Sequence, residues 1–242
     1  MERDMDASLL AIGFVVFLAA FTQSLSGFGL ALVSMALLPA LVGIRTATAL
    51  VALIAVVIEV VLLLRYRQAL EFRAIWRVML ASAVGAPVGI ALLRGLDEGV
   101  AMFVLGVVLV GYALYALLGL RLPRLEHPLW AYLAGLLGGV LGGAYNTSGP
   151  PVIIYASCRD WPPEVFKSNL QGYFLFSSTV VVVGHALGGS FTPEVWRLFW
   201  LSLPPIALGL LAGMSLDRWL SPVTFRRVVQ VLLVVMGVRL ML

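Results

Sequence analysis

Residues 146–151 read NTSGPP, and they interrupt an apolar stretch that runs from AYLAGLLGGVLGGAY (131–145) to VIIYAS (152–157). Glycine and proline break helices, and asparagine, threonine and serine add hydrogen-bonding groups to a segment that otherwise has few. A second interruption, SLSGFG at 24–29, lies inside another apolar stretch near the N-terminus. What the two interruptions do depends on the kind of protein that surrounds them.

The composition indicates a membrane protein. Of the 242 residues, 62% are hydrophobic and 12% are charged, and the mean hydropathy is +1.05. A soluble domain is about 45–50% apolar and about 25% charged, so this chain has too little polar surface to cover a soluble fold. Apolar runs of about 18 residues or more recur along the chain, as in transmembrane helices. We therefore expect an all-α polytopic membrane protein with little mass outside the bilayer.

The charges and the few reactive side chains exclude several other classes. The net charge of +4 comes from basic residues in short loops, which fits membrane orientation and gives no reason to expect a nucleic-acid partner. Two histidines and one cysteine, none of them clustered, offer neither a metal site nor a nucleophile with its base. We expect no enzyme activity, no catalytic residue, no cofactor and no metal. Cys158 is interpreted as a small apolar filler.

The apolar segments are of two lengths. Six have the length of a single span, whereas the first and the fifth are longer than a bilayer core of about 30 Å requires. Each long segment contains one of the interruptions. The acidic start MERDMDASLL lacks the positive region of a signal peptide, so residues from 8 onward are expected to belong to the mature structure. The expected segments are 8–42, 46–64, 72–94, 98–120, 129–158, 164–187, 194–216 and 221–241.

The two halves of the chain resemble each other. When Ser26 and Gly27 are aligned with Ser148 and Gly149, Arg45 falls on Lys167 without a gap. After a two-residue insertion, the matching pairs are Arg73 with Arg197, Trp76 with Trp200, Gly85 with Gly209, Gly89 with Gly213, Arg94 with Arg218 and Leu96 with Leu220. This pattern is typical of the internal duplication of transporters. We expect two repeats, 1–122 and 123–242, in one transmembrane domain.

The distribution of lysine and arginine favours inverted repeats. If each broken segment is a re-entrant hairpin followed by three transmembrane helices, both termini lie outside the cytoplasm. Eleven basic residues are then cytoplasmic and five (Arg3, Arg45, Arg94, Arg197 and Arg239) are outside, whereas a single crossing at each break gives nine against seven. The positive-inside rule prefers the first split. A double crossing at each break gives the same sides, but PPVIIYASC is too short to span. The eleven cytoplasmic residues are Arg65, Arg67, Arg73, Arg77, Arg121, Arg124, Arg159, Lys167, Arg218, Arg226 and Arg227.

The two breaks together predict an anion site. Gly27 and Gly149 permit a tight reversal, and Pro150 and Pro151 suit the first turn of a new helix. Ser26 in the first copy, and Ser148 or Asn146 in the second, are expected to cap the helices that follow. Two helix N-termini would then point at each other near the midplane and attract an anion through their dipoles and free N–H groups. The alternative is that both breaks are merely kinks between packed helices.

The glycine-rich break near the N-terminus, its return as GGVLGGAYNTSGPPVIIYAS (138–157) and the basic residue about 18 positions on from each break resemble the sulfite exporter TauE/SafE family. The resemblance covers essentially the whole chain. It implies a secondary transporter of the bacterial inner membrane for sulfite or small organosulfur anions such as C2 sulfonates. The first break departs from the family pattern, because SGFGLALVS lacks the usual run of glycines and the early proline. From the residues alone, the expected partners are a small anion and the lipid bilayer.

Four questions stay open at this level. An anion channel of the same architecture is the alternative function, and a homodimer is one of several arrangements. Glu59 is interpreted first as the partner of Arg65 and second as a proton-coupling group. His185 is interpreted first as an interfacial residue and second as a proton sensor. Arg45 and Lys167 are expected at two entrances. The expected substrate-binding residues are Gln23, Ser24, Ser26, Gly27, Tyr145, Asn146, Thr147, Ser148, Gly149, Asn169 and Gln171.

Overall fold

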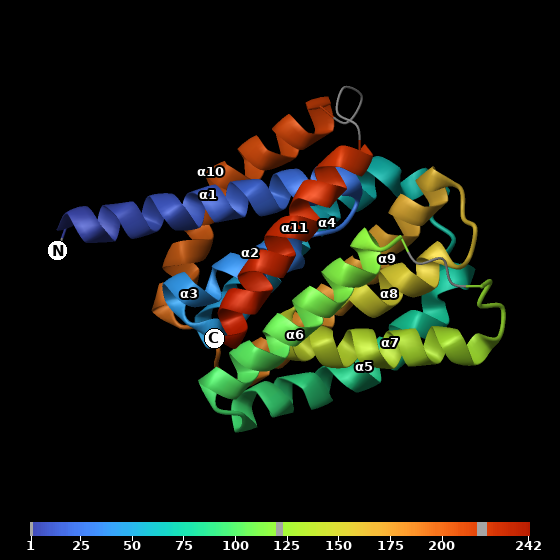
Figure 1. Cartoon of the computed structure of the whole chain (residues 1–242), viewed down its shortest axis with the longest axis horizontal. Coiled ribbons are helices and arrows are strands. Elements are labelled where there is room, and N and C mark those ends of the chain that lie inside the picture. The colour runs from blue at the N-terminus through green and yellow to red at the C-terminus, as the bar shows by residue number, and fades with distance from the viewer. Residues whose placement is uncertain (1, 120–122, 217–221) are drawn as a thin grey trace.

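The structure is a computed structural model, and it describes residues 2–119, 123–216 and 222–242. These residues form helices and connecting loops without strands (Figure 1). The sequence-aligned residues Arg218 and Leu220, and the loop residue Arg121, lie outside the described ranges. The helices are α1 (Glu2–Ser26), α2 (Leu30–Leu37), α3 (Pro39–Val42), α4 (Ile44–Tyr66), the 3₁₀ turn η1 (Arg67–Ala69), α5 (Phe72–Gly95), α6 (Glu98–Leu117), α7 (Pro128–Tyr145), α8 (Gly149–Ser157), α9 (Pro163–Leu187), α10 (Pro193–Leu216) and α11 (Pro222–Met241).

Six helices in the described part of the chain are long and apolar enough to cross a membrane. Five of them are segments that the sequence predicted as single spans. The remaining one of these six helices is the part of α1 before the first break, Leu9–Ser26, which is long enough to span the bilayer by itself. The sequence prediction treated this part as one arm of a long broken segment. One more segment, 221–241, was predicted from the sequence as a span. Within the described residues, its apolar part is the shorter helix Val229–Met241.

The long helices come in the same order in the two halves. Each half has a long helix, a break, a short helix after the break and three further long helices, so in chain order α1, α4, α5 and α6 correspond to α7, α9, α10 and α11. The first half has in addition the short helix α3 and the turn η1. The main packing pairs correspond as well. Helix α5 packs against α7 as α10 packs against α1, and the pairs α4 with α9 and α6 with α11 join corresponding helices. In Figure 1, α5 and α7 lie along one edge of the molecule and α1 and α10 along the opposite edge.

Glycines allow the closest of these contacts. A Cβ atom at Gly85 would lie 2.4 Å from the Leu136 carbonyl oxygen of α7, and one at Gly89 would lie 2.0 Å from the Val140 carbonyl oxygen. The aligned glycines of α10 lie against α1 in the same way, with 2.5 Å from Gly209 to Phe17 O and 2.8 Å from Gly213 to Phe21 O. Small residues allow helix backbones to approach each other within a membrane. In both halves, the aligned glycines therefore allow two helix backbones to pack closely against each other.

Helices α4 and α9 pack antiparallel in the middle of the chain's fold. Arg45 and Thr48, in the first turns of α4, share a cavity with His185 in the last turn of α9. At the other end, the Lys167 ammonium of α9 lies 5.6 Å from the ring centre of Tyr66, the last residue of α4. Helices α4 and α9, which hold the same place in the two halves, therefore run in opposite directions.

Candidate functional site

The first break is held by two glutamines. Helix α1 continues through Ser24 and Ser26, so the break covers only residues 27–29, and Gly27 and Gly29 have φ angles of 82° and 112°. The Gln23 side-chain oxygen accepts a hydrogen bond of 3.0 Å from the N–H of Leu30, the first residue of α2. The Gln171 amide of α9 donates to the Gly27 carbonyl over 2.6 Å, and the two glutamine side chains lie 3.3 Å apart.

The expected cap at Ser26 was wrong. Ser26 is the last residue of α1, where its hydroxyl bonds to the Thr22 carbonyl over 2.7 Å and also contacts the Phe28 backbone. A hydroxyl on the last turn of one helix points back along that helix and does not reach the start of the next one. Gln23, one turn earlier, has the longer side chain that reaches Leu30. The N-cap residue of α2 is Gly29, which has no side chain to contribute.

The second break covers residues 146–148, since α7 ends at Tyr145 and α8 begins at Gly149. The tight reversal was expected at Gly149, but Gly149 is the first residue of α8 and the left-handed backbone is at Asn146, which has φ 54°. Asparagine tolerates this conformation better than most residues. Pro150 and Pro151 occupy the first turn of α8, as predicted. Ser148 is the N-cap residue, but its side chain makes no capping hydrogen bond, because its backbone is already helical (φ −69°, ψ −14°).

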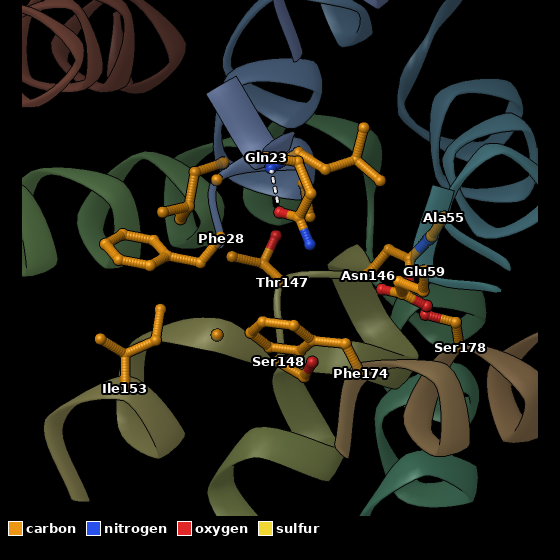
Figure 2. A pocket seen from close by; sticks show the side chains of 15 residues that line it. Gln23, Phe28, Ala55, Glu59, Asn146, Thr147, Ser148, Ile153, Phe174 and Ser178 are labelled. Carbon is orange, nitrogen blue, oxygen red and sulfur yellow. Dashed lines mark hydrogen bonds between the residues drawn. The ribbon is translucent and has the colours of Figure 1, made fainter. Parts of the chain in front are cut away.

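One cavity joins the two breaks. It contains Gln23 and the start of α2 on one side and the whole second break with the start of α8 on the other, and Figure 2 shows their side chains converging. Its volume is about 30 Å³, and a cavity needs about 10–15 Å³ by such a measure to hold one water molecule. A sulfur oxyanion is larger than this, so its binding requires the lining side chains to move apart. The lining residues are Gln23, Phe28, Gly29, Leu30, Ala31, Leu32, Ala55, Glu59, Asn146, Thr147, Ser148, Gly149, Ile153, Phe174 and Ser178.

The hydrogen-bonding capacity of this cavity is only partly used. The Asn146 amide nitrogen is buried and has no partner. Leu30, Ala31 and Leu32 form the first turn of α2, where backbone N–H groups lack partners within the helix, although Gln23 takes that of Leu30. Thr147 uses its hydroxyl on the Tyr145 carbonyl over 2.9 Å. The remaining donors are suited to the oxygens of an anion.

Several predicted substrate-binding residues lie outside the cavity lining. Ser24 donates to the Leu210 carbonyl over 3.2 Å and so ties α1 to α10. The Asn169 oxygen accepts the N–H of Glu71 over 2.8 Å and ties α9 to the start of α5. Four more predicted residues lie in or beside the breaks without lining the cavity: Ser26, Gly27, Tyr145 and Gln171. Five predicted residues do line the cavity: Gln23, Asn146, Thr147, Ser148 and Gly149.

Glu59 differs from its first interpretation. Its side chain is 4% exposed and lines the cavity, and its Oε2 atom has no hydrogen-bond partner. Among the described residues it makes no ion pair with Arg65, whose guanidinium lies 5.8 Å from the ring centre of Tyr66. Phe174 and Ser178 of α9 were also missed. The available signal was their spacing from Gln171, three and seven positions along the same helix, which places all three on one face.

A second, larger cavity opens beside Arg45. It has a volume of about 370 Å³ and is lined by Arg45, Arg94, His185 and the loop after α9. His185 lies in the last turn of α9, where it is 4% exposed and neither ring nitrogen has a hydrogen-bond partner. Lys167 lies at the opposite end of α4, with its side-chain stem 3.2 Å from the position of a Cβ at Gly27.

The chain is similar to known transporters over its whole length. The family model of the sulfite exporter TauE/SafE matches residues 12–240. A curated relative, the "Probable sulfite/organosulfonate exporter TauE" of Cupriavidus necator, is 28% identical over 253 residues, which cover 100% of this chain and 97% of the relative. The "Probable inner membrane transporter protein TsaS" of Comamonas testosteroni is 29% identical over 181 residues, covering 73% of this chain and 74% of that protein. No solved structure matches this chain significantly.

Proposed function

Because this chain belongs to the sulfite exporter TauE/SafE family, we propose that it carries sulfite or C2 sulfonates across the bacterial inner membrane as a secondary transporter. It is a multi-pass membrane transporter and not an enzyme. The anion binds in the central cavity, between the starts of α2 and α8. One observation carries this proposal: two breaks that lie far apart in the sequence line a single buried cavity.

The chemistry of the cavity favours an oxyanion. Two helix N-termini supply positive potential without a lysine or arginine, which would be costly at this depth. The unpartnered Asn146 amide and the Ser148 hydroxyl can direct hydrogen bonds at separate oxygens. Phe28, Ile153 and Phe174 provide apolar contacts on the same cavity, which suit the carbon part of a small sulfonate.

The repeat architecture supports a carrier. The packing pairs recur between the halves, and the corresponding helices α4 and α9 run antiparallel around the breaks. In transporters built from inverted repeats, one repeat or helix bundle moves against the other around a fixed binding site, which opens to each face in turn.

Binding and flux measurements on the purified protein test this function. Isethionate, sulfoacetate and sulfite are expected to bind with saturation in calorimetric titrations, and acetate is the control anion without sulfur. In proteoliposomes, unlabelled isethionate on one side is expected to accelerate the exit of labelled isethionate from the other. An anion channel of the same architecture would show flux without this acceleration, and that result would reject the carrier.

A further inference from the structure

An acidic side chain lies in the proposed anion site, which is unexpected for a site that attracts anions. Glu59 of α4 lines the central cavity together with Asn146 and the starts of α2 and α8. In Figure 2 its carboxyl group lies next to Asn146 and Ser178. It is 4% exposed, and its Oε2 atom has no hydrogen-bond partner. Such a group needs an explanation, because an ionised carboxylate and a bound anion would repel each other.

No cation balances this carboxyl group among the described residues. Helix α9 faces it with Phe174 and Ser178, and α2 carries no charged residue. The ionisable neighbour that interacts with Glu59 electrostatically is the Tyr173 hydroxyl of α9, which is itself bonded to Ser82 over 3.1 Å. The other charged groups of the helices around it lie near helix ends: Arg45, Arg65, Arg67, Glu98, Glu164, Lys167, His185, Glu194 and Arg197.

A proton resolves both difficulties. An unpaired ionised carboxylate in a low-dielectric interior is strongly disfavoured, and such groups take up a proton instead. The protonated group is neutral, so it does not repel an anion. Its O–H can donate a hydrogen bond either to the Ser178 hydroxyl or to an oxygen of the substrate. When the cavity opens to water, the carboxyl group is hydrated again and can release the proton.

We propose that Glu59 takes up one proton with each substrate anion, so that the protein is a proton-coupled carrier. The inference rests on the proposed function of the central cavity. The proton resides on a Glu59 carboxyl oxygen while the site is closed and leaves when the site opens. A sulfonate with one negative charge then crosses as a neutral pair with its proton, and a pH difference across the membrane drives its movement.

Isethionate is the appropriate probe, because its sulfonate stays ionised between about pH 5 and pH 9, a range that includes the titration of buried carboxyl groups in proteins. Any proton taken up on binding must therefore go to the protein. Calorimetric titrations in two buffers of different ionisation enthalpy measure that number. At pH values above the pKa that Glu59 has in the open site, we expect the wild-type protein to take up close to one proton for each isethionate bound. In that pH range the affinity for isethionate should fall about tenfold for each unit by which the pH rises.

Glu59→Gln resembles the protonated carboxyl group and cannot titrate. We expect it to bind isethionate without proton uptake and with an affinity that does not depend on pH. In proteoliposomes, a lower pH on one side of the membrane is expected to drive isethionate to accumulate on the opposite side. We expect this accumulation for the wild-type protein and not for Glu59→Gln. Glu194→Gln is the matched control, because Glu194 is exposed at the start of α10; it should behave as wild type.

The outcomes separate this inference from the proposed function. Saturable binding of isethionate by the wild-type protein without proton uptake would overturn the role of Glu59 and leave the transporter intact, and this result does not depend on the folding of any variant. Proton uptake that persists in Glu59→Gln would also overturn it. A wild-type protein that binds isethionate at no pH would reject the proposed function and the inference together.

Discussion

At the scale of single residues, the second break is expected to contribute more side-chain binding energy than the first. Asn146 and Ser148 line the central cavity, and the Asn146 amide has no other partner. Ser26 lies outside that cavity and is bonded to the Thr22 carbonyl. We expect Asn146→Ala or Ser148→Ala to weaken isethionate binding by about 1–3 kcal/mol, the usual loss for a buried polar partner. Ser26→Ala is expected to change binding less.

Calorimetric titration of the three variants at one pH measures these losses. Ser26→Ala serves as the matched control, since it also removes a serine hydroxyl, in this case beside the first break. If Asn146→Ala and Ser148→Ala both bind isethionate as tightly as the wild-type protein, the breaks are structural kinks and the anion binds elsewhere.

Sequence alone could identify polar residues near the site but not their partners. Gln23 and Gln171 were expected to bind substrate, yet they bond to the backbone of the first break and to each other. Glu59 was assigned to Arg65 because the two are close along α4, whereas the fold turns Glu59 toward the cavity. Distance along a helix does not tell which face a neighbouring helix covers, and that determines whether a polar side chain meets substrate, backbone or another side chain.

At the scale of helices, the aligned glycines can be tested directly. A methyl group at Gly89 would lie 2.0 Å from the Val140 carbonyl oxygen, so Gly89→Ala must push α5 and α7 apart. We expect a loss of about 1–3 kcal/mol in stability, as for other overpacked sites, measured as a lower unfolding temperature in detergent. Gly111→Ala in α6 is the matched control, because nothing lies within 4 Å of its Cβ position. The control should unfold at the wild-type temperature or above it.

If Gly89→Ala unfolds at the same temperature as Gly111→Ala, the contact between α5 and α7 is looser than the structure has it. Sequence predicted these glycines as equivalent because they recur in the same frame. It could not predict that they lie against α7 and α1, since the pairing of helices follows from long-range packing.

The entrance charges are the second feature at this scale. Arg45, near the start of α4, lines the larger cavity together with Arg94 of α5. Lys167 lies at the other end of α4. The two ends of α4 are about 30 Å apart at the usual helical rise of ~1.5 Å per residue. We expect Arg45→Gln to slow isethionate uptake up to about tenfold at low salt and much less at high salt, because salt screens long-range attraction.

Initial uptake rates at several salt concentrations check this expectation. Arg239→Gln is the matched control, because it removes a charge from the last turn of α11 that does not line the larger cavity. An effect of Arg45→Gln that is equal at all salt concentrations would mean that Arg45 acts through packing or direct contact.

At the scale of the whole molecule, the orientation in the membrane remains a prediction. The structure gathers several basic residues at two ends. The start of α4, the end of α5 and the end of α9 meet around Arg45, Arg94 and His185. The end of α4, the start of α5 and the start of α9 meet at the other end through Tyr66, Lys167, Glu71 and Asn169. That second end also carries Arg65, Arg67, Arg73 and Arg77.

The positive-inside rule assigns the second end to the cytoplasm. Since α6 starts at the first end and α11 is its counterpart in the second repeat, inverted repeats place both termini outside the cytoplasm. We expect a reporter that is active only in the cytoplasm to be silent when fused after Leu242, and active when inserted in the loop near Arg121. An active C-terminal fusion, with the loop insertion as a positive control for expression, would contradict the inverted arrangement, because one repeat would then cross the membrane an even number of times.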